Sequence, residues 1–184
     1  MNEAEFLTIV TAVPANAALL DLLPSLELPQ CHLTAGCLFQ PVWNARSGLS
    51  LDWGIKDFDV FYFDDTDLSW EAEDEIIQQA NRFLGELAGS VEIRNQARVH
   101  LWYEQRFGKP ISELASARDG IDRFLISCTC LGIEVSSGAL YAPNGLTDIW
   151  AGILRMNPRN PQPVLFQAKA EDYQARWPWL TRED

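Results

Sequence analysis

The chain has 184 residues, of which 47% are hydrophobic, and a formal net charge of −12 at pH 7. This length supports one well-buried core, and the hydrophobic share excludes an intrinsically disordered chain. A surface this acidic repels duplex nucleic acid, whose binding depends on neutralisation of phosphates by Lys and Arg. A small anion held through metal ions is the more compatible ligand.

The four cysteines and two histidines are poor material for a structural zinc site, because no Cys-x-x-Cys pair is present. Residues 1–5 carry acids where a secretory signal carries positive charge, and the apolar runs are far shorter than a membrane span. We therefore expect a cytoplasmic protein with reduced thiols and no membrane partner.

The elements of the first half are read from apolar periodicity and turn residues. Residues 1–25 have the spacing of two short helices, and a tight turn at 33–37 leads into a helix that ends at 47–48. Residues 56–63 are typical of a buried strand. Ser69 is a good N-cap for a helix with an apolar stripe over 76–87, residues 91–94 indicate a second short strand, and Asn95 caps another helix.

The second half is less regular. We expect a helix near 112–123, a strand over 124–131, a hairpin around 136–138 and a short helix near 146–154. The rest is rich in Pro and Arg and ends in Trp177-Pro178-Trp179, whose rings should pack onto the body. Together these elements predict one domain over 1–184, with a core at about 25–110 and a smaller C-terminal subdomain at about 111–184.

Asp57 and Asp59 are the most informative residues, because they lie two positions apart in a strand that is otherwise apolar. Alternate strand residues point to the same face, so the two carboxylates emerge side by side. Paired carboxylates repel each other and resist desolvation, and a divalent cation would compensate them. The alternative is that both residues end a strand and bind neighbouring backbone groups.

Three short motifs occur in an order that resembles the polymerase-β-like nucleotidyltransferase superfamily. They are Ala35-Gly36-Cys37 at the start of a helix, Asp57-Phe58-Asp59-Val60 on a strand, and Val91-Glu92-Ile93 on a later strand. The runs at 57–64, 67–71, 94–100 and 155–159 are similar to a bacterial, largely uncharacterised family within it. The resemblance covers about residues 33–160. It implies an α+β fold in which helices flank a nucleotidyltransferase-like mixed β-sheet, with a small C-terminal α/β extension.

The resemblance also implies metal chemistry at three carboxylates. Asp57 and Asp59 would be catalytic and hold the Mg²⁺ that accompanies the triphosphate of an NTP, while Glu92 would help a second Mg²⁺ activate an acceptor hydroxyl. Two metal ions suit in-line displacement at phosphorus, and oxygen ligands suit Mg²⁺. Glu92 on its own is a weak signal, because one acid on a short strand is usually exposed to solvent.

Four further residues are candidates for nucleotide binding. Gly36 and Cys37 would face the phosphates through their backbone N–H groups at a helix N-terminus. Arg94 and Arg98 could clamp the triphosphate, although Arg94 could equally form a surface ion pair with Glu92. The turn departs from the superfamily, which usually has Gly-Gly or Gly-Ser where this chain has Cys37 after Gly36. The stretch from Gly36 to Asp57 is also longer than usual.

These features predict a nucleotidyltransferase that moves a nucleoside monophosphate from an NTP to an unknown hydroxyl acceptor. The acidic surface favours a small molecule or a protein as the acceptor, and duplex nucleic acid is the less suitable partner. The altered turn leaves a second hypothesis, a catalytically inactive nucleotide- and metal-binding sensor or partner-recognition module. A third is a structural protein that docks a partner through exposed Trp177 and Trp179.

Overall fold

The computed structural model describes residues 1–183, apart from the side chain of Phe107, as eight α-helices, seven strands and four short 3₁₀ helices. The helices are α1 (Glu3–Thr11), α2 (Pro14–Leu22), α3 (Gly36–Arg46), α4 (Trp70–Leu84), α5 (Val99–Phe107), α6 (Ala117–Ile121), α7 (Thr147–Ala151) and α8 (Pro163–Arg176). The strands are β1 (His32–Thr34), β2 (Phe58–Tyr62), β3 (Val91–Asn95), β4 (Gly132–Glu134), β5 (Leu140–Tyr141), β6 (Ile153–Arg155) and β7 (Thr181–Glu183).

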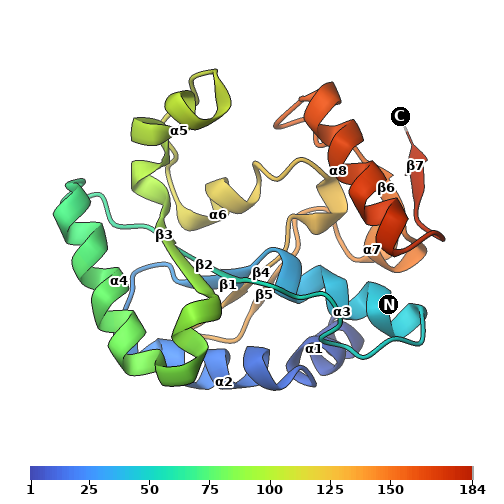
Figure 1. Cartoon of the computed structure of the whole chain (residues 1–184), viewed down its shortest axis with the longest axis horizontal. Helices are drawn as coiled ribbons and strands as arrows, with labels where there is room; N and C mark the ends of the chain where they lie inside the picture. The colour runs from blue at the N-terminus through green and yellow to red at the C-terminus, as the bar shows by residue number, and fades with distance from the viewer. Residues whose placement is uncertain (184) are drawn as a thin grey trace.

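A five-stranded mixed sheet in the order β3-β2-β1-β4-β5 forms the centre of the molecule. Strands β2 and β3 pair in parallel, and the other neighbours in this sheet are antiparallel. Helices α1 and α2 lie on one side of the sheet, whereas α5, α6 and α8 lie on the other (Figure 1). Strands β6 and β7 form a separate parallel pair beside α7 and α8, which is the small C-terminal α/β extension.

Local sequence signals account for the helices of the first half. Asn2 and Glu5 form a capping box at the start of α1, and the hydroxyl of Ser69 accepts a 3.2 Å hydrogen bond from the N–H of Ala72 at the start of α4. The predicted helices in 1–25, after the turn at 33–37 and after Ser69 are confirmed, as are the strands at 56–63 and 91–94. The hairpin around 136–138 and the helix near 146–154 are confirmed as well.

The segment 124–131 was expected to be a strand, and the structure corrects this. Its centre is the 3₁₀ helix Ser127–Thr129, in which the hydroxyl of Thr129 donates a 2.8 Å hydrogen bond to the carbonyl of Ile126. Ile126 still forms an isolated antiparallel bridge with Met156, and beyond it the backbone bonds to itself, from the N–H of Thr129 to the carbonyl of Ile126. The helix expected near 112–123 is limited to α6, because Ser116 provides its N-cap.

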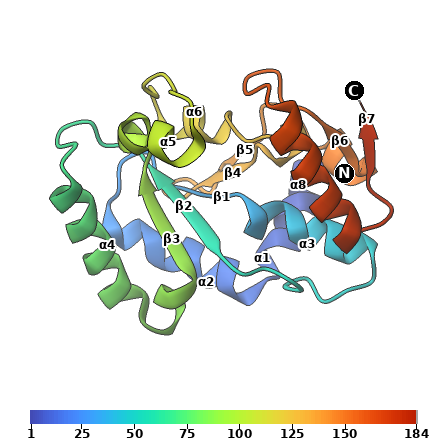
Figure 2. The same ribbon diagram turned by 45° about the horizontal axis from the view of Figure 1, so that its top comes forward.

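The longest helix of the C-terminal part, α8, was not anticipated from the sequence. Trp177, which directly follows α8, is fully buried, and its ring centroid lies 5.1 Å from that of Trp43 on α3. Its indole N–H also donates a 2.9 Å hydrogen bond to Asn44. Figure 2 shows the resulting arrangement, with α8 lying against α3 although the two helices are far apart in the sequence.

The same packing decides the place of the terminal tryptophans. Trp177 is buried as expected, and Trp179 is partly buried, with its indole N–H donating a 2.9 Å hydrogen bond to the hydroxyl of Ser47. A docking surface built from two exposed rings is therefore not present at Trp177 and Trp179. The idea of a structural protein that binds a partner through them is wrong.

Among residues 1–183, no single helix is long and apolar enough to cross a membrane. The segments Glu3–Thr11 and Pro14–Leu26 reach the length and apolar composition of a membrane span only when they are counted together. A bend of 98° separates them.

Candidate active site

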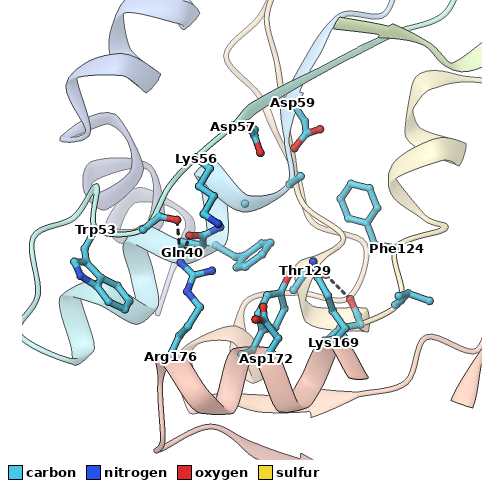
Figure 3. Close-up of a pocket in the computed structure, with 17 residues that line it drawn as sticks. Gln40, Trp53, Lys56, Asp57, Asp59, Phe124, Thr129, Lys169, Asp172 and Arg176 are labelled. Atoms are coloured by element: carbon cyan, nitrogen blue, oxygen red, sulfur yellow. Dashed lines mark hydrogen bonds between the residues drawn. The ribbon is translucent and has the colours of Figure 1, made fainter. Parts of the chain in front are cut away.

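A cleft of about 690 Å³ lies between the sheet and α8 (Figure 3). One wall comes from the turn before α3, the first turns of that helix and the approach to β2, and the opposite wall comes from α8. The charged side chains that line it are Lys56, Asp57, Asp59, Lys169, Asp172 and Arg176. The long loop between α3 and β2 adds Trp53 and Gly54. Acidic and basic groups thus face the same space from elements distant in the sequence.

The structure brings the three predicted carboxylates to one face of the sheet. Figure 3 shows Asp57 and Asp59 pointing into the cleft, while the intervening Phe58 is buried on the opposite face. In the parallel pairing of β2 and β3, Asp59 is the register partner of Glu92. Register partners on strands about 4.8 Å apart place their side chains on the same face. Glu92 therefore lies beside Asp59, at the edge strand of the sheet.

The pKa of Asp59 reflects the burial and the negative charge of this cluster. Its pKa is raised from the ordinary value of 3.8 to about 6, first because the group is buried and then because the carboxylates of Glu92 and Asp57 repel its charge. Arg94 and Lys169 act in the opposite direction and compensate only in part. Among the described residues, neither Asp57 nor Asp59 forms an ion pair. The cluster therefore has negative charge that a bound cation would stabilise.

The protein side chains alone do not complete a metal site. Within residues 1–183, no group of three or more His, Cys, Asp or Glu side chains is arranged so that it could hold a metal ion. This is the usual situation for Mg²⁺, which proteins bind through one or two carboxylates together with water and substrate phosphates. The donor chemistry of Asp57 and Asp59 fits an ion of this kind, because both present hard oxygen atoms at one point of the cleft.

The turn before α3 presents its backbone to the cleft. Ala35 has φ 62° and ψ −137°, a conformation that L residues rarely adopt, and no side chain caps the helix that follows. Ala35 and Gly36 both line the cleft. A Cβ atom added to Gly36 would lie 2.5 Å from the amide nitrogen of Gln40, so a larger residue would displace that side chain. The uncapped N–H groups and the helix dipole suit an anion here.

Cys37 contributes to this turn only through its backbone. Its side chain is fully buried, and the thiol donates a 3.1 Å hydrogen bond to the carbonyl of Thr34. Burial, followed by the charge of Asp59, raises the pKa of the thiol well above its usual range. The sulfur atom points into the core, so a contact between this side chain and a phosphate is absent from the geometry.

Positive charge in the cleft comes from residues that were not among the predicted site residues. Of the three lysines of the chain, Lys56 and Lys169 line the cleft and Lys109 does not. Arg176 donates hydrogen bonds to the side chain of Gln40 at 2.7 Å and to the carbonyl of Gly54 at 3.0 Å, so it also ties the long loop to α3 and α8. The sequence holds one signal for the residues of α8 that line the cleft. Helical spacing places 169, 172 and 176 on one face of that helix.

The two arginines predicted to clamp the triphosphate lie in different environments. Arg94 shares a face with Glu92 as expected, and the closest approach of the two side chains is 3.4 Å. Arg98 is a correction: its buried guanidinium forms an ion pair with Glu73 of α4 and donates a 3.0 Å hydrogen bond to the carbonyl of Leu68. The pair holds α4 against the end of β3 and keeps Arg98 out of the cleft.

The mixed sheet flanked by helices is a nucleotidyltransferase type of fold. It carries a turn that presents backbone N–H groups, paired aspartates at the start of a strand and a third carboxylate on the parallel neighbour. The chain belongs to the Nucleotidyltransferase family, whose model matches residues 21–182. A solved structure described as revealing a CCA-adding enzyme head domain is similar over 100% of this chain and 96% of its own, with a TM-score of 0.77 and 24% identity. This likeness confirms the predicted fold class. No curated protein matches the chain.

Proposed function

We propose that the protein transfers a nucleoside monophosphate from an NTP to a hydroxyl acceptor, in a reaction that depends on two Mg²⁺ ions. The observation that supports this most strongly is that Asp57 and Asp59 line the cleft beside Lys56 and face Lys169 of α8, with Glu92 in register with Asp59 on the neighbouring strand. Carboxylates alone would repel a triphosphate, and lysines alone would bind any phosphate. Together they suit a substrate that enters as a complex of metal and triphosphate.

Each side chain has a role in this proposal. Asp57 and Asp59 would hold the ion that accompanies the triphosphate, and Glu92 would contribute to the site of the second ion. When bound, such ions stabilise negative charge on the attacking and leaving oxygens. The backbone of Gly36 and the lysines would position the phosphates, because both supply donors to anionic oxygen.

A second candidate function is nucleotide binding without transfer. The turn favours it, because Cys37 turns its thiol into the core and supplies no hydroxyl to the phosphates. The two functions differ in the role of Glu92. Transfer needs this carboxylate on the acceptor side, whereas binding alone depends on Asp57 and Asp59.

The test has a binding step and a transfer step. Calorimetry with Mg²⁺ and a non-hydrolysable NTP should show binding to the wild type and loss of binding in the double variant Asp57→Ala, Asp59→Ala. The exposed Asp65 provides a matched control, Asp65→Ala, which should bind normally. Unchanged affinity in the double variant would refute the role assigned to the two aspartates.

The transfer step uses NTPs labelled at the α-phosphate together with cell extract separated into small molecules, proteins and RNA. We expect labelled product and released pyrophosphate with the wild type, and loss of both in Glu92→Gln with nucleotide affinity retained. Label in small molecules or proteins would support the acceptor class we propose, and label in RNA would contradict it. Nucleotide binding with no transfer to any fraction would favour the second candidate function.

The proposed working compartment is the cytoplasm. All four cysteines are free, and each of them is buried. Unpaired thiols support a reducing environment.

A further inference from the structure

A second cavity, of about 280 Å³, lies beside the cleft on the same face of the sheet. Phe124 and Leu125 line both spaces and separate them. Its floor includes Phe61 and Arg94, which are register partners on β2 and β3 and lie two residues beyond Asp59 and Glu92. The cavity therefore lies further along the same two strands that carry Asp59 and Glu92.

The walls of this cavity are mainly aromatic and aliphatic. Phe61 and Phe124 meet edge to face with their centroids 5.9 Å apart, and Trp102 and Tyr103 of α5 contribute two more rings. Apolar walls with a small number of polar groups are typical of small-molecule sites, and rings favour a planar ligand. The size suits a ligand with a single ring system.

Two arginines supply positive charge to this apolar space. The guanidinium of Arg123 forms no ion pair or hydrogen bond with the part of the chain that the structure describes, in a protein with a net charge of −12. Among the described residues, Arg94 forms an ion pair with Glu92 alone, at 3.4 Å and exposed to solvent. An unpaired guanidinium beside an apolar cavity suits a carboxylate or phosphate, which it can bind through two parallel hydrogen bonds.

We propose that this cavity binds the acceptor, and that the acceptor is a small molecule with a planar aromatic ring, one anionic group and a free hydroxyl. This rests on the proposed function for the reaction itself. Arg94 carries the connection, because it lines the cavity and also contacts Glu92. A ligand whose anionic group is held by Arg123 and Arg94 keeps its ring among the aromatic walls and its hydroxyl near Glu92.

The resulting step is balanced without a further reactant. The hydroxyl oxygen of the acceptor bonds to the α-phosphorus of the NTP, and the bond from that phosphorus to the pyrophosphate oxygen breaks. The hydroxyl proton leaves to water, and the products are the nucleotidyl ester of the acceptor and pyrophosphate. Phe124 and Leu125 line both spaces, so the acceptor hydroxyl would meet the α-phosphorus where the cavity adjoins the cleft.

The binding test uses phenyl phosphate as the probe, with phenol and methyl phosphate as partial probes, followed by ligand-observed NMR. We expect phenyl phosphate to bind at least tenfold more tightly than either partial probe. Arg123→Ala and Leu165→Trp should each weaken it at least tenfold, the first by removing the charge and the second by filling the cavity. Leu165 is 41% exposed, so the larger ring can be accommodated without unfolding.

Matched controls separate this cavity from the phosphate site. Val164→Trp changes an 81% exposed neighbour that does not line the cavity, and it should leave binding unchanged. Phenyl phosphate should also bind normally to Lys169→Ala and in the presence of a non-hydrolysable NTP with Mg²⁺. If the NTP displaces it, or if Arg123→Ala and Leu165→Trp bind it as the wild type does, the inference is wrong.

The test of phenyl phosphate binding does not depend on the site that binds the NTP. Phenyl phosphate should still bind to the double variant Asp57→Asn, Asp59→Asn, so a protein that fails to bind NTP can still confirm the second cavity. Where labelled transfer is observed, Leu165→Trp should lower it at least tenfold while NTP affinity stays unchanged. Transfer at the wild-type rate in Leu165→Trp would overturn the acceptor role and leave the proposed function in place.

Discussion

Asp59 and Glu92 are register partners on two parallel strands, and this relationship makes a cluster out of residues 33 positions apart. The aspartate is the buried member of the pair, and the glutamate, with a side chain 52% exposed, is the open one. Because the pKa of the inner carboxylate is raised and the outer one is exposed to solvent, the two groups are suited to different tasks. The inner one suits the ion that accompanies the triphosphate, and the outer one suits a second ion on the acceptor side.

The raised pKa of Asp59 predicts how stability depends on pH. The unfolded chain releases this proton near 3.8, whereas the folded protein retains it up to about 6. Between these values the native state binds more protons, so the free energy of unfolding of the metal-free protein should fall as pH rises from 4 to 6, by about 2 kcal/mol. Urea denaturation in EDTA across this range measures the effect.

Asp59→Asn is the control for this dependence. The amide of the variant does not titrate, so it causes no loss of stability as pH rises. The free energy of unfolding of the variant, relative to that of the wild type, should therefore increase from pH 4 to 6. Mg²⁺ should weaken the dependence in the wild type, because it binds the deprotonated form. Parallel pH profiles for the two proteins would contradict the assignment.

The three lysines form a natural series for nucleotide binding. Lys56→Ala and Lys169→Ala should each raise the dissociation constant of a non-hydrolysable NTP about tenfold, because each removes a charge-assisted contact to phosphate. Lys109→Ala removes the same charge outside the cleft and should have little effect. Calorimetry at constant ionic strength measures all three. An equal loss in Lys109→Ala would indicate a general charge effect instead of a site.

Arg98→Ala should act on stability. It leaves the carboxylate of Glu73 buried without its partner, which costs about 3–5 kcal/mol. The double variant Glu73→Gln, Arg98→Met should recover part of that loss, because neither buried charge then remains. Urea denaturation measures both, with the exposed Arg82→Ala as a control expected within about 0.5 kcal/mol of the wild type. Full stability in Arg98→Ala would show that the ion pair does not hold α4.

Ala35→Gly should stabilise the protein, against the usual trend for this substitution. The positive φ of Ala35 costs about 1–3 kcal/mol, which glycine removes while adding a smaller entropic loss. We expect a net gain of about 1 kcal/mol in the free energy of unfolding. Ala45→Gly, at an exposed position of the helix that follows Ala35, should lose about 1 kcal/mol. Equal losses at both positions would mean that Ala35 is not strained.

Whether an element could be predicted from the sequence depends on how far apart in the chain the residues that determine it lie. The helix after Ser69 and the strand at β2 are predictable because a cap and a short periodic pattern determine them locally. The segment 124–131 has the composition of a strand, yet a side-chain bond within four residues turns it into a 3₁₀ helix. Arg98 shows the same limit for sites, since its partner Glu73 lies 25 positions away on another element.

The sequence by itself determined the carboxylate pair, since strand alternation places Asp57 and Asp59 on one face wherever the strand lies. It also determined the family and the residues available for chemistry. Only the tertiary structure decided that α8 closes the cleft with Lys169 and Arg176, and that a second cavity forms over Phe61 and Arg94. The reason is physical: alternation and capping act over a few residues, whereas the buried Trp177 that anchors α8 depends on contacts with α3, more than a hundred positions away.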